Sequence, residues 1–180
     1  GLAALLKAQD PSRDWRAIKN LILAGGDDNS ALANTIAQKR LNAHGSLACS
    51  NAAVFSRLKP VANVVVGAVG TPIDLAALNI LCAAPNGDVA VSVSPGGQPT
   101  TLLDDGAAPD QAAGDGIYSG RFTPSAAGTF TLTFPDGDVV TVNVQGPLIG
   151  VTPNSQDFGA VVVGGAVDRT FTVQNVGVGT

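Results

Sequence analysis

The fold is decided by the stretch TFTLTFPDGDVVTVNV, residues 129–144. Phe130, Leu132 and Phe134 alternate with threonines, which is the period-two pattern of a strand with one buried face. The residues at 135–137, Pro-Asp-Gly, are typical of a turn, and a valine-rich alternating run follows them. The stretch therefore predicts a β-hairpin whose apolar side chains face a core.

The same strand pattern continues upstream of the hairpin. Val89, Val91 and Val93 alternate with small partners, and Gly, Pro, Asn and Asp punctuate the sequence at short intervals. We expect strands near 62–69, 73–83, 88–94, 99–103, 117–123, 128–134 and 138–145. Seven short strands are the number expected of an all-β immunoglobulin-like sandwich.

The first 58 residues have a helical pattern instead. Residues 2–8 predict a helix that ends at Asp10-Pro11, because proline disfavours helix in the residue before it. A second predicted helix, capped by Asp10 or Ser12, ends at the glycines of residues 25–26. A weaker helical or loop stretch covers 31–38, and the helical pattern resumes over 40–58 through Phe55. This segment is too small and too one-sided to bury its own apolar faces, which implies that a sheet once lay against it, outside this fragment.

Charge divides the chain at the same place. Residues 1–60 hold eight Lys or Arg against four Asp, and residues 61–180 hold two Arg against ten Asp. We therefore expect a domain boundary near residue 59, and a further segment opens at Gly146-Pro147, so the expected domains are 1–58, 59–146 and 147–180. The last has three strand-like runs and reads as a truncated second β-sandwich. The apolar opening at Gly1, without Met, indicates an internal fragment.

Composition also excludes two kinds of partner. The chain is acidic overall, with a formal net charge of −4, which argues against a nucleic-acid partner. Its longest apolar runs fall well short of the ~20 residues that a membrane helix needs. We predict neither nucleic-acid binding nor a membrane span.

Cys49 and Cys82 are the two cysteines of the chain. Their spacing matches neither a CxxC redox motif nor a zinc site, since both need further ligands nearby. They lie on opposite sides of the expected boundary near residue 59, so a disulfide would join the two domains. Two buried free thiols are the alternative.

One loop gathers carboxylates: DDGAAPDQAAGDG, residues 104–116, which contains Asp104, Asp105, Asp110 and Asp115. Calcium takes six to eight oxygen ligands, and such a loop could wrap one ion. The spacing is not that of an EF-hand, and the chain has no Glu for bidentate closure. The favoured alternative is structural: Asp caps backbone N–H groups and Gly takes positive φ in successive turns. Arg121 is a candidate partner for one loop aspartate.

The sequence predicts no catalytic residue within the chain. His44 is the sole histidine, and Ser46 lies two residues away, where helical side chains point apart. The glycine pairs at 96–97 and 164–165 precede neither a helix nor a Lys, so they indicate hairpin turns and not phosphate loops.

Three stretches resemble known families. The first 58 residues resemble the C-terminal helices of subtilisin-like serine peptidases (subtilases), which are α/β proteins, through GLAALL, DWRAIKNLILAGGD and KRLNAHGSLA. The residues Arg40-Leu41-Asn42-Ala43 match the start of the family's last helix. Lys39 stands where the family often has glycine. Residues 61–146 resemble a β-sandwich module of secreted bacterial peptidases, through the order DDG, GDGIYSG and FTPSAAGTF. Residues 147–180 resemble the start of choice-of-anchor D or Hydin-like repeats, through FGAVVVGG and QNVG.

These resemblances imply an exported, modular bacterial protein, secreted or at the cell surface. They imply a serine endopeptidase with an Asp/His/Ser triad outside this chain, acting on protein or peptide substrates, with the β domains as spacers, stabilising units or adhesive modules. His44 does not match the family's catalytic histidine. The alternative is a non-enzymatic structural or adhesion protein that binds calcium through the Asp loop.

Overall fold

The predicted hairpin is the centre of one sheet. In the computed structural model, which describes residues 1–178, β10 (Gly128–Thr133) pairs antiparallel with β11 (Val139–Gln145), and Gly137 N–H donates to the Phe134 carbonyl in the turn. The sheet has the order β4-β11-β10-β7-β8, with β4 (Val64–Ala68) parallel to β11. β7 (Val89–Ser94) pairs with β10, and β8 (Thr100–Leu102) pairs with β7.

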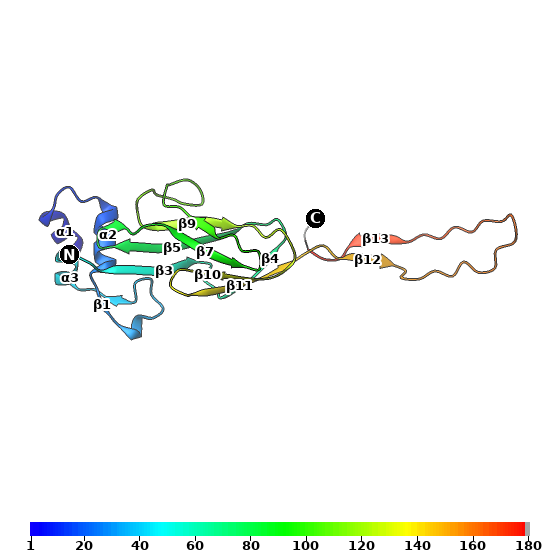
Figure 1. Ribbon diagram of the computed structural model, residues 1–180, viewed down its shortest axis with the longest axis horizontal. Coiled ribbons are helices and arrows are strands. Elements are labelled where there is room, and N and C mark those ends of the chain that lie inside the picture. Colours follow the sequence, from blue (N-terminus) through cyan, green and yellow to red (C-terminus); the bar gives the residue numbers. More distant parts are fainter. Residues whose placement is uncertain (179–180) are drawn as a thin grey trace.

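A second sheet packs on the first (Figure 1). Its central strand is β5 (Ile73–Leu81), with β3 (Ala53–Lys59) on one side and β9 (Ile117–Phe122) on the other. The short β6 (Ala84–Pro85) pairs with the end of β5. A bridge between Leu103 and Ser119 joins the end of β8 to β9, so the two sheets meet along this side.

The core between the sheets consists of the inward-facing apolar side chains. In β7 the burial pattern alternates strictly, as the sequence predicts. The buried cluster comprises Leu75, Ala77, Val89, Val91, Val93, Leu102, Tyr118, Phe122, Leu132, Phe134, Val140, Val142 and Val144. All seven strands predicted between residues 62 and 145 are confirmed to within a few residues. The molecule is mostly β-sheet, in the manner of a β-sandwich.

A helical layer lies at one end of the sandwich and packs on the outer face of the β5 sheet there (Figure 1). It contains α1 (Leu2–Gln9), α2 (Trp15–Ala24) and the short α3 (Ala43–Leu47). Between them lie the 3₁₀ turn η1 (Ser30–Leu32) and a two-stranded ladder of β1 (Asp27–Asp28) and β2 (Lys39–Arg40). Ala24 of α2 packs with Val54 of β3 and with Leu78 and Ile80 of β5 in a second buried cluster. α2 therefore packs on the β5 sheet of this chain itself, whereas the sequence implied a sheet outside the fragment.

Two predictions in the helical segment are wrong. The helix expected over 40–58 is limited to α3, and its second half is strand β3. Backbone pairing with β5 replaces helical hydrogen bonds there, because a non-local partner overrides local propensity. The cap of α2 is neither Asp10 nor Ser12 but Asp14, whose carboxylate accepts from Ala17 N–H at 2.9 Å.

The segment after residue 146 projects from the end of the sandwich (Figure 1). β12 (Ile149–Thr152) and β13 (Thr172–Asn175) pair antiparallel, so the three strands expected there are corrected to two. Phe158 and Phe171 remain exposed, so these two side chains are not buried in a core of this segment. The expected domain 147–180 ends with two residues outside the described part. No helix in residues 1–178 is long and apolar enough to span a membrane.

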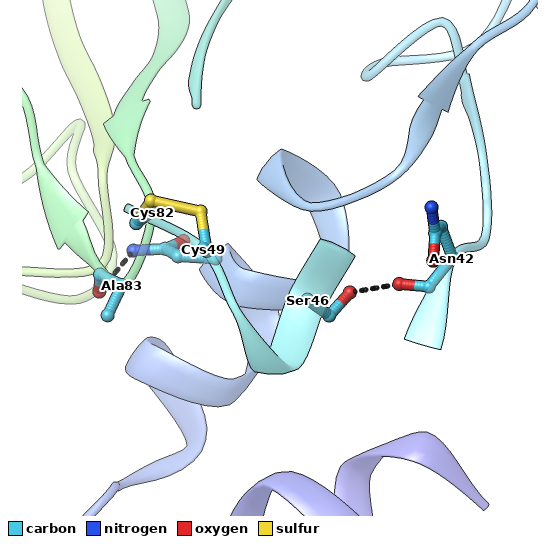
Figure 2. Close-up of a disulfide and its surroundings, with 6 residues drawn as sticks. Asn42, Ser46, Cys49, Cys82 and Ala83 are labelled. Atoms are coloured by element: carbon cyan, nitrogen blue, oxygen red, sulfur yellow. Dashed lines mark hydrogen bonds between the residues drawn. A yellow bond between two sulfur atoms is a disulfide. The ribbon is translucent and has the colours of Figure 1, made fainter. Parts of the chain in front are cut away.

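A disulfide ties the helical layer to β5. Cys49, just after α3, is bonded to Cys82, just after β5, across a sequence separation of 33 residues (Figure 2). Beside it, the Asn20 side-chain amide of α2 donates to the Ala83 carbonyl at 3.3 Å. The helical layer thus has a covalent and a hydrogen-bonded attachment to the same strand end.

Replacing both cysteines, as Cys49→Ser with Cys82→Ser, should lower the free energy of unfolding by about 3–4 kcal/mol, the chain-entropy value for a loop of this length. Urea unfolding of the oxidised protein and of the double variant measures the difference. Wild-type protein kept in reductant is the matched control and should behave like the variant. A difference below about 1 kcal/mol would contradict a stabilising role for this bond.

Candidate metal centre

The Asp loop connects β8 to β9 and folds back on itself through glycines. Gly106, Gly114 and Gly116 all have positive φ, at +73°, +72° and +83°. At Gly116 the requirement is also steric, because an added Cβ would collide with the Ile80 side chain of β5. The Gly116 carbonyl accepts from Asn79 N–H of β5 at 2.9 Å, so this end of the loop is held directly on the central strand.

Three of the four predicted aspartates come together. Ligand oxygens of Asp104, Asp110 and Asp115 all lie within 4.8 Å of one another, and Asp110 and Asp115 are each only 6% exposed. Asp105 lies outside this group, is exposed, and accepts from Ala107 N–H at 2.8 Å. The cluster could hold a metal ion.

Each clustered carboxylate also organises the backbone of the loop. Asp104 accepts from the N–H groups of Asp115 at 3.1 Å and Gly116 at 2.8 Å. Asp110 accepts from Gly106 at 2.7 Å and Gln111 at 2.9 Å, and Asp115 accepts from Ile117 at 2.8 Å. These are the turn-forming bonds of the structural alternative. A carboxylate oxygen that accepts one hydrogen bond still has a free lone pair, so the bonds do not exclude a cation.

Lys19 of α2 is the residue that sequence reasoning missed. Its ammonium donates to the Asp115 carbonyl at 2.7 Å and lies 3.7 Å from the Asp115 carboxylate. The contact joins residues 96 positions apart. The sequence placed Lys19 on the polar face of an amphipathic helix, which indicated that it could form an ion pair. It did not indicate that the partner would be Asp115.

Arg121 does not pair with the loop. Its guanidinium lies 3.0 Å from the Asp74 carboxylate on the neighbouring strand β5, which corrects the expected contact. Arg121 and Asp74 are directly opposite in the ladder, and cross-strand partners of opposite charge attract. Lys19 therefore supplies the positive charge at the Asp loop.

A pocket of about 230 Å³ opens beside the cluster. Asp110 and Asp115 line it together with Lys59, Asp74 and Ser119. Its lining otherwise includes aliphatic side chains of β3, β5 and β9. All metal-capable groups at this place are carboxylates, which are hard oxygen ligands suited to Ca²⁺ or Mg²⁺ and not to soft metals.

His44 and Ser46 do not form a nucleophilic pair. The Ser46 side chain is buried, and its hydroxyl donates to the Asn42 carbonyl at 2.8 Å (Figure 2). The Asn42 side chain accepts from Gly45 N–H and caps α3. Within residues 1–178 no hydrogen bond joins His44 to Ser46, so the chemistry of an activated serine is not built at this helix.

Comparison with known proteins adds little. No protein-family model and no curated protein sequence matches the chain. A search of solved structures found similarity to the crystal structure of an engineered protein from the Northeast Structural Genomics Consortium, with 17% identity and a TM-score of 0.33. The match covers 56% of this chain and 22% of that chain.

Tyr118, the single tyrosine, is buried in the sandwich core. Burial raises the pKa of its phenol above the ordinary 10.0, and the negative charges of Asp104 and Asp88 raise it further. A raised folded-state pKa means that stability is retained below pH 10 and is lost as pH rises from there through the folded pKa.

We expect the folded protein to titrate its phenol above pH 10.0 and the urea-unfolded protein to titrate near 10.0, as followed by phenolate absorbance. The free energy of unfolding should fall above pH 10, and Tyr118→Phe should make that fall shallower. Equal midpoints for the folded and unfolded protein would contradict the burial of this phenol.

Proposed function

We propose that this chain is part of an exported subtilisin-like serine endopeptidase, in which α1–α3 continue the catalytic domain and the sandwich stabilises it. The observation that carries the proposal is the attachment of these helices, the part that resembles a subtilase, to the outer face of the β5 sheet. Buried packing of Ala24, the Lys19–Asp115 ion pair and the Cys49–Cys82 bond all contribute. A sandwich held in this way would move with the catalytic domain as one body.

The helical layer keeps apolar surface available for such a domain. Leu5 and Trp15 are each 53% exposed, and Leu41 is 62% exposed. In the proposed protein they pack against residues outside this chain. The Asp/His/Ser triad also lies outside it, with the serine attacking the peptide carbonyl and the histidine taking its proton.

Export is supported by the disulfide, because such bonds persist mainly in oxidising compartments. Under this proposal the sandwich is an immunoglobulin-like spacer or stabilising module. The projecting β12–β13 hairpin belongs to a further module of the same kind. Protein or peptide substrates of the hydrolysis are bound by the catalytic part.

The test is to express the complete gene that encodes this chain and treat the product with a serine-directed fluorophosphonate probe. We expect one labelled serine upstream of the helices and hydrolysis of a casein substrate that the probe abolishes. The matched variant, Cys49→Ser with Cys82→Ser, should shorten the half-life of activity on heating and leave kcat/KM unchanged. Absence of a labelled serine and of hydrolysis would leave the structural or adhesion protein as the better interpretation.

A second candidate function, calcium binding at the Asp loop, is favoured by the meeting of Asp104, Asp110 and Asp115. Three carboxylates repel one another at this separation, and a divalent cation would relieve that repulsion. Saturating calcium at about 100 times its Kd would stabilise the fold by about 2.7 kcal/mol, or about 5–10 °C in Tm.

Thermal unfolding with calcium chloride and with EDTA tests this candidate. Asp110→Asn with Asp115→Asn should abolish the rise in Tm, since the amides keep the shape and remove the charge. Asp105→Asn is the matched control, because Asp105 lies in the same loop but outside the cluster. If calcium does not change the Tm of the wild-type protein, calcium binding at the Asp loop is excluded.

A further inference from the structure

Strand β3 is an edge strand with one unpaired side. It pairs with β5 through Ala53–Arg57, and β9 occupies the opposite side of β5 (Figure 1). Within residues 1–178, no strand pairs with the outer side of β3. The ladder shifts register between Arg57 and Lys59, so the regular part of the edge is Ala53–Arg57. Such an edge offers backbone N–H and C=O groups to another extended chain.

The outer side of β3 borders a groove. Its far wall is the segment 33–39, and its end is the β10–β11 turn at 136–138. Two hollows lie along this side of β3: the one beside residues 33–38 measures about 990 Å³ and its neighbour about 280 Å³. Both are lined by Ile36, Gln38 and Phe55, so they form one continuous groove along the edge.

The groove wall is held in place by its own contacts. In the β1–β2 ladder, Lys39 lies 2.8 Å from Asp28, and Arg40 lies 2.8 Å from Asp27. The pKa of the Asp27 carboxyl is lowered first by its hydrogen bond from Arg40 and next by that from Asn42. The wall therefore stands beside the edge without pairing with it.

The groove is lined by exposed apolar side chains and, at one end, by an acidic side chain. Val61 and Ile36 are 89% and 51% exposed and offer apolar contact. The Arg57 guanidinium is already paired with Asp138 at 2.6 Å and bonded to the Pro60 carbonyl. Asp136 forms no ion pair among the described residues, so this end of the groove carries an uncompensated negative charge.

We propose that the β3 edge and this groove bind an extended peptide that adds antiparallel to Ala53–Arg57, with apolar side chains toward Ile36 and Val61 and a basic residue at its N-terminal end beside Asp136. An edge strand gives affinity through main-chain hydrogen bonds, and the groove gives side-chain selectivity. Antiparallel addition brings the peptide N-terminus to the Arg57 end, where Asp136 lies. This site uses neither the Asp loop nor any residue outside the chain, so it stands apart from the proposed peptidase.

The probe is the synthetic peptide acetyl-Arg-Val-Thr-Val-Thr-Val-amide, titrated into the ¹⁵N-labelled chain. We expect amide shift changes centred on residues 53–57, with saturation at or below about 1 mM. A strand adds through one edge only. The N–H groups of alternate residues then point toward β3, so we use two peptides that are N-methylated at odd or at even residues. One of them should bind about tenfold or more weakly, and the other should keep the affinity of the parent peptide.

Variants of the protein distinguish binding in the groove from nonspecific binding to exposed apolar side chains. Val61→Glu should weaken binding by about tenfold, and Val66→Glu, a 66% exposed position on β4, is the matched control that should not. Asp136→Asn should weaken binding of this peptide but not of its acetyl-Ser analogue. Lack of binding at 1 mM, equal binding of both N-methylated peptides, or dimerisation through β3 that the peptide does not displace would each overturn the proposal.

Discussion

The burial of β5 on both faces is the constraint on which the rest of the structure depends. Leu75 and Ala77 face the sandwich interior, and Leu78 and Ile80 belong to the cluster beneath the helices. A strand covered on both faces needs a continuous apolar run, and residues 75–78 supply one. Its two edges hold β3 and β9, its C-terminal end carries Cys82, and its backbone anchors the Asp loop at Gly116. Helices, sandwich and loop are thus related to one another through one strand.

Alternation and turn chemistry made the sandwich predictable, because each strand there has one buried face. In β7 and in the β10–β11 hairpin, the period-two pattern is unambiguous. The same reasoning failed at β3, where Val54, Phe55 and Leu58 fit a helical stripe as well as a strand. A short apolar run cannot decide between the two, and the deciding partner, β5, lies some twenty residues further along the chain.

At the candidate site, too, features set by neighbouring residues were predictable, and contacts between residues far apart in the sequence were not. Carboxylate and glycine spacing located the loop, because turns depend on neighbouring residues. It did not separate Asp105 from the three clustered aspartates, and it could not find Lys19. That ammonium is itself a cation placed against the cluster, and Coulomb repulsion between it and a divalent ion lowers the affinity that the three carboxylates would otherwise have. A metal ion bound here would therefore compete with the attachment of α2 for the charge of Asp115.

The free edge of β3 follows from how the helical layer connects to the sheet. After α3 the chain enters the sheet as its outermost strand, and the segment before α3 runs beside that strand as a wall. An unprotected edge invites sheet-to-sheet aggregation, and proteins commonly cover such edges with a loop. Here the segment 33–39 stands apart from the strand and leaves a groove between them, which is where the proposed peptide would bind. In the proposed complex, the same wall that borders the edge would also select the side chains of the peptide.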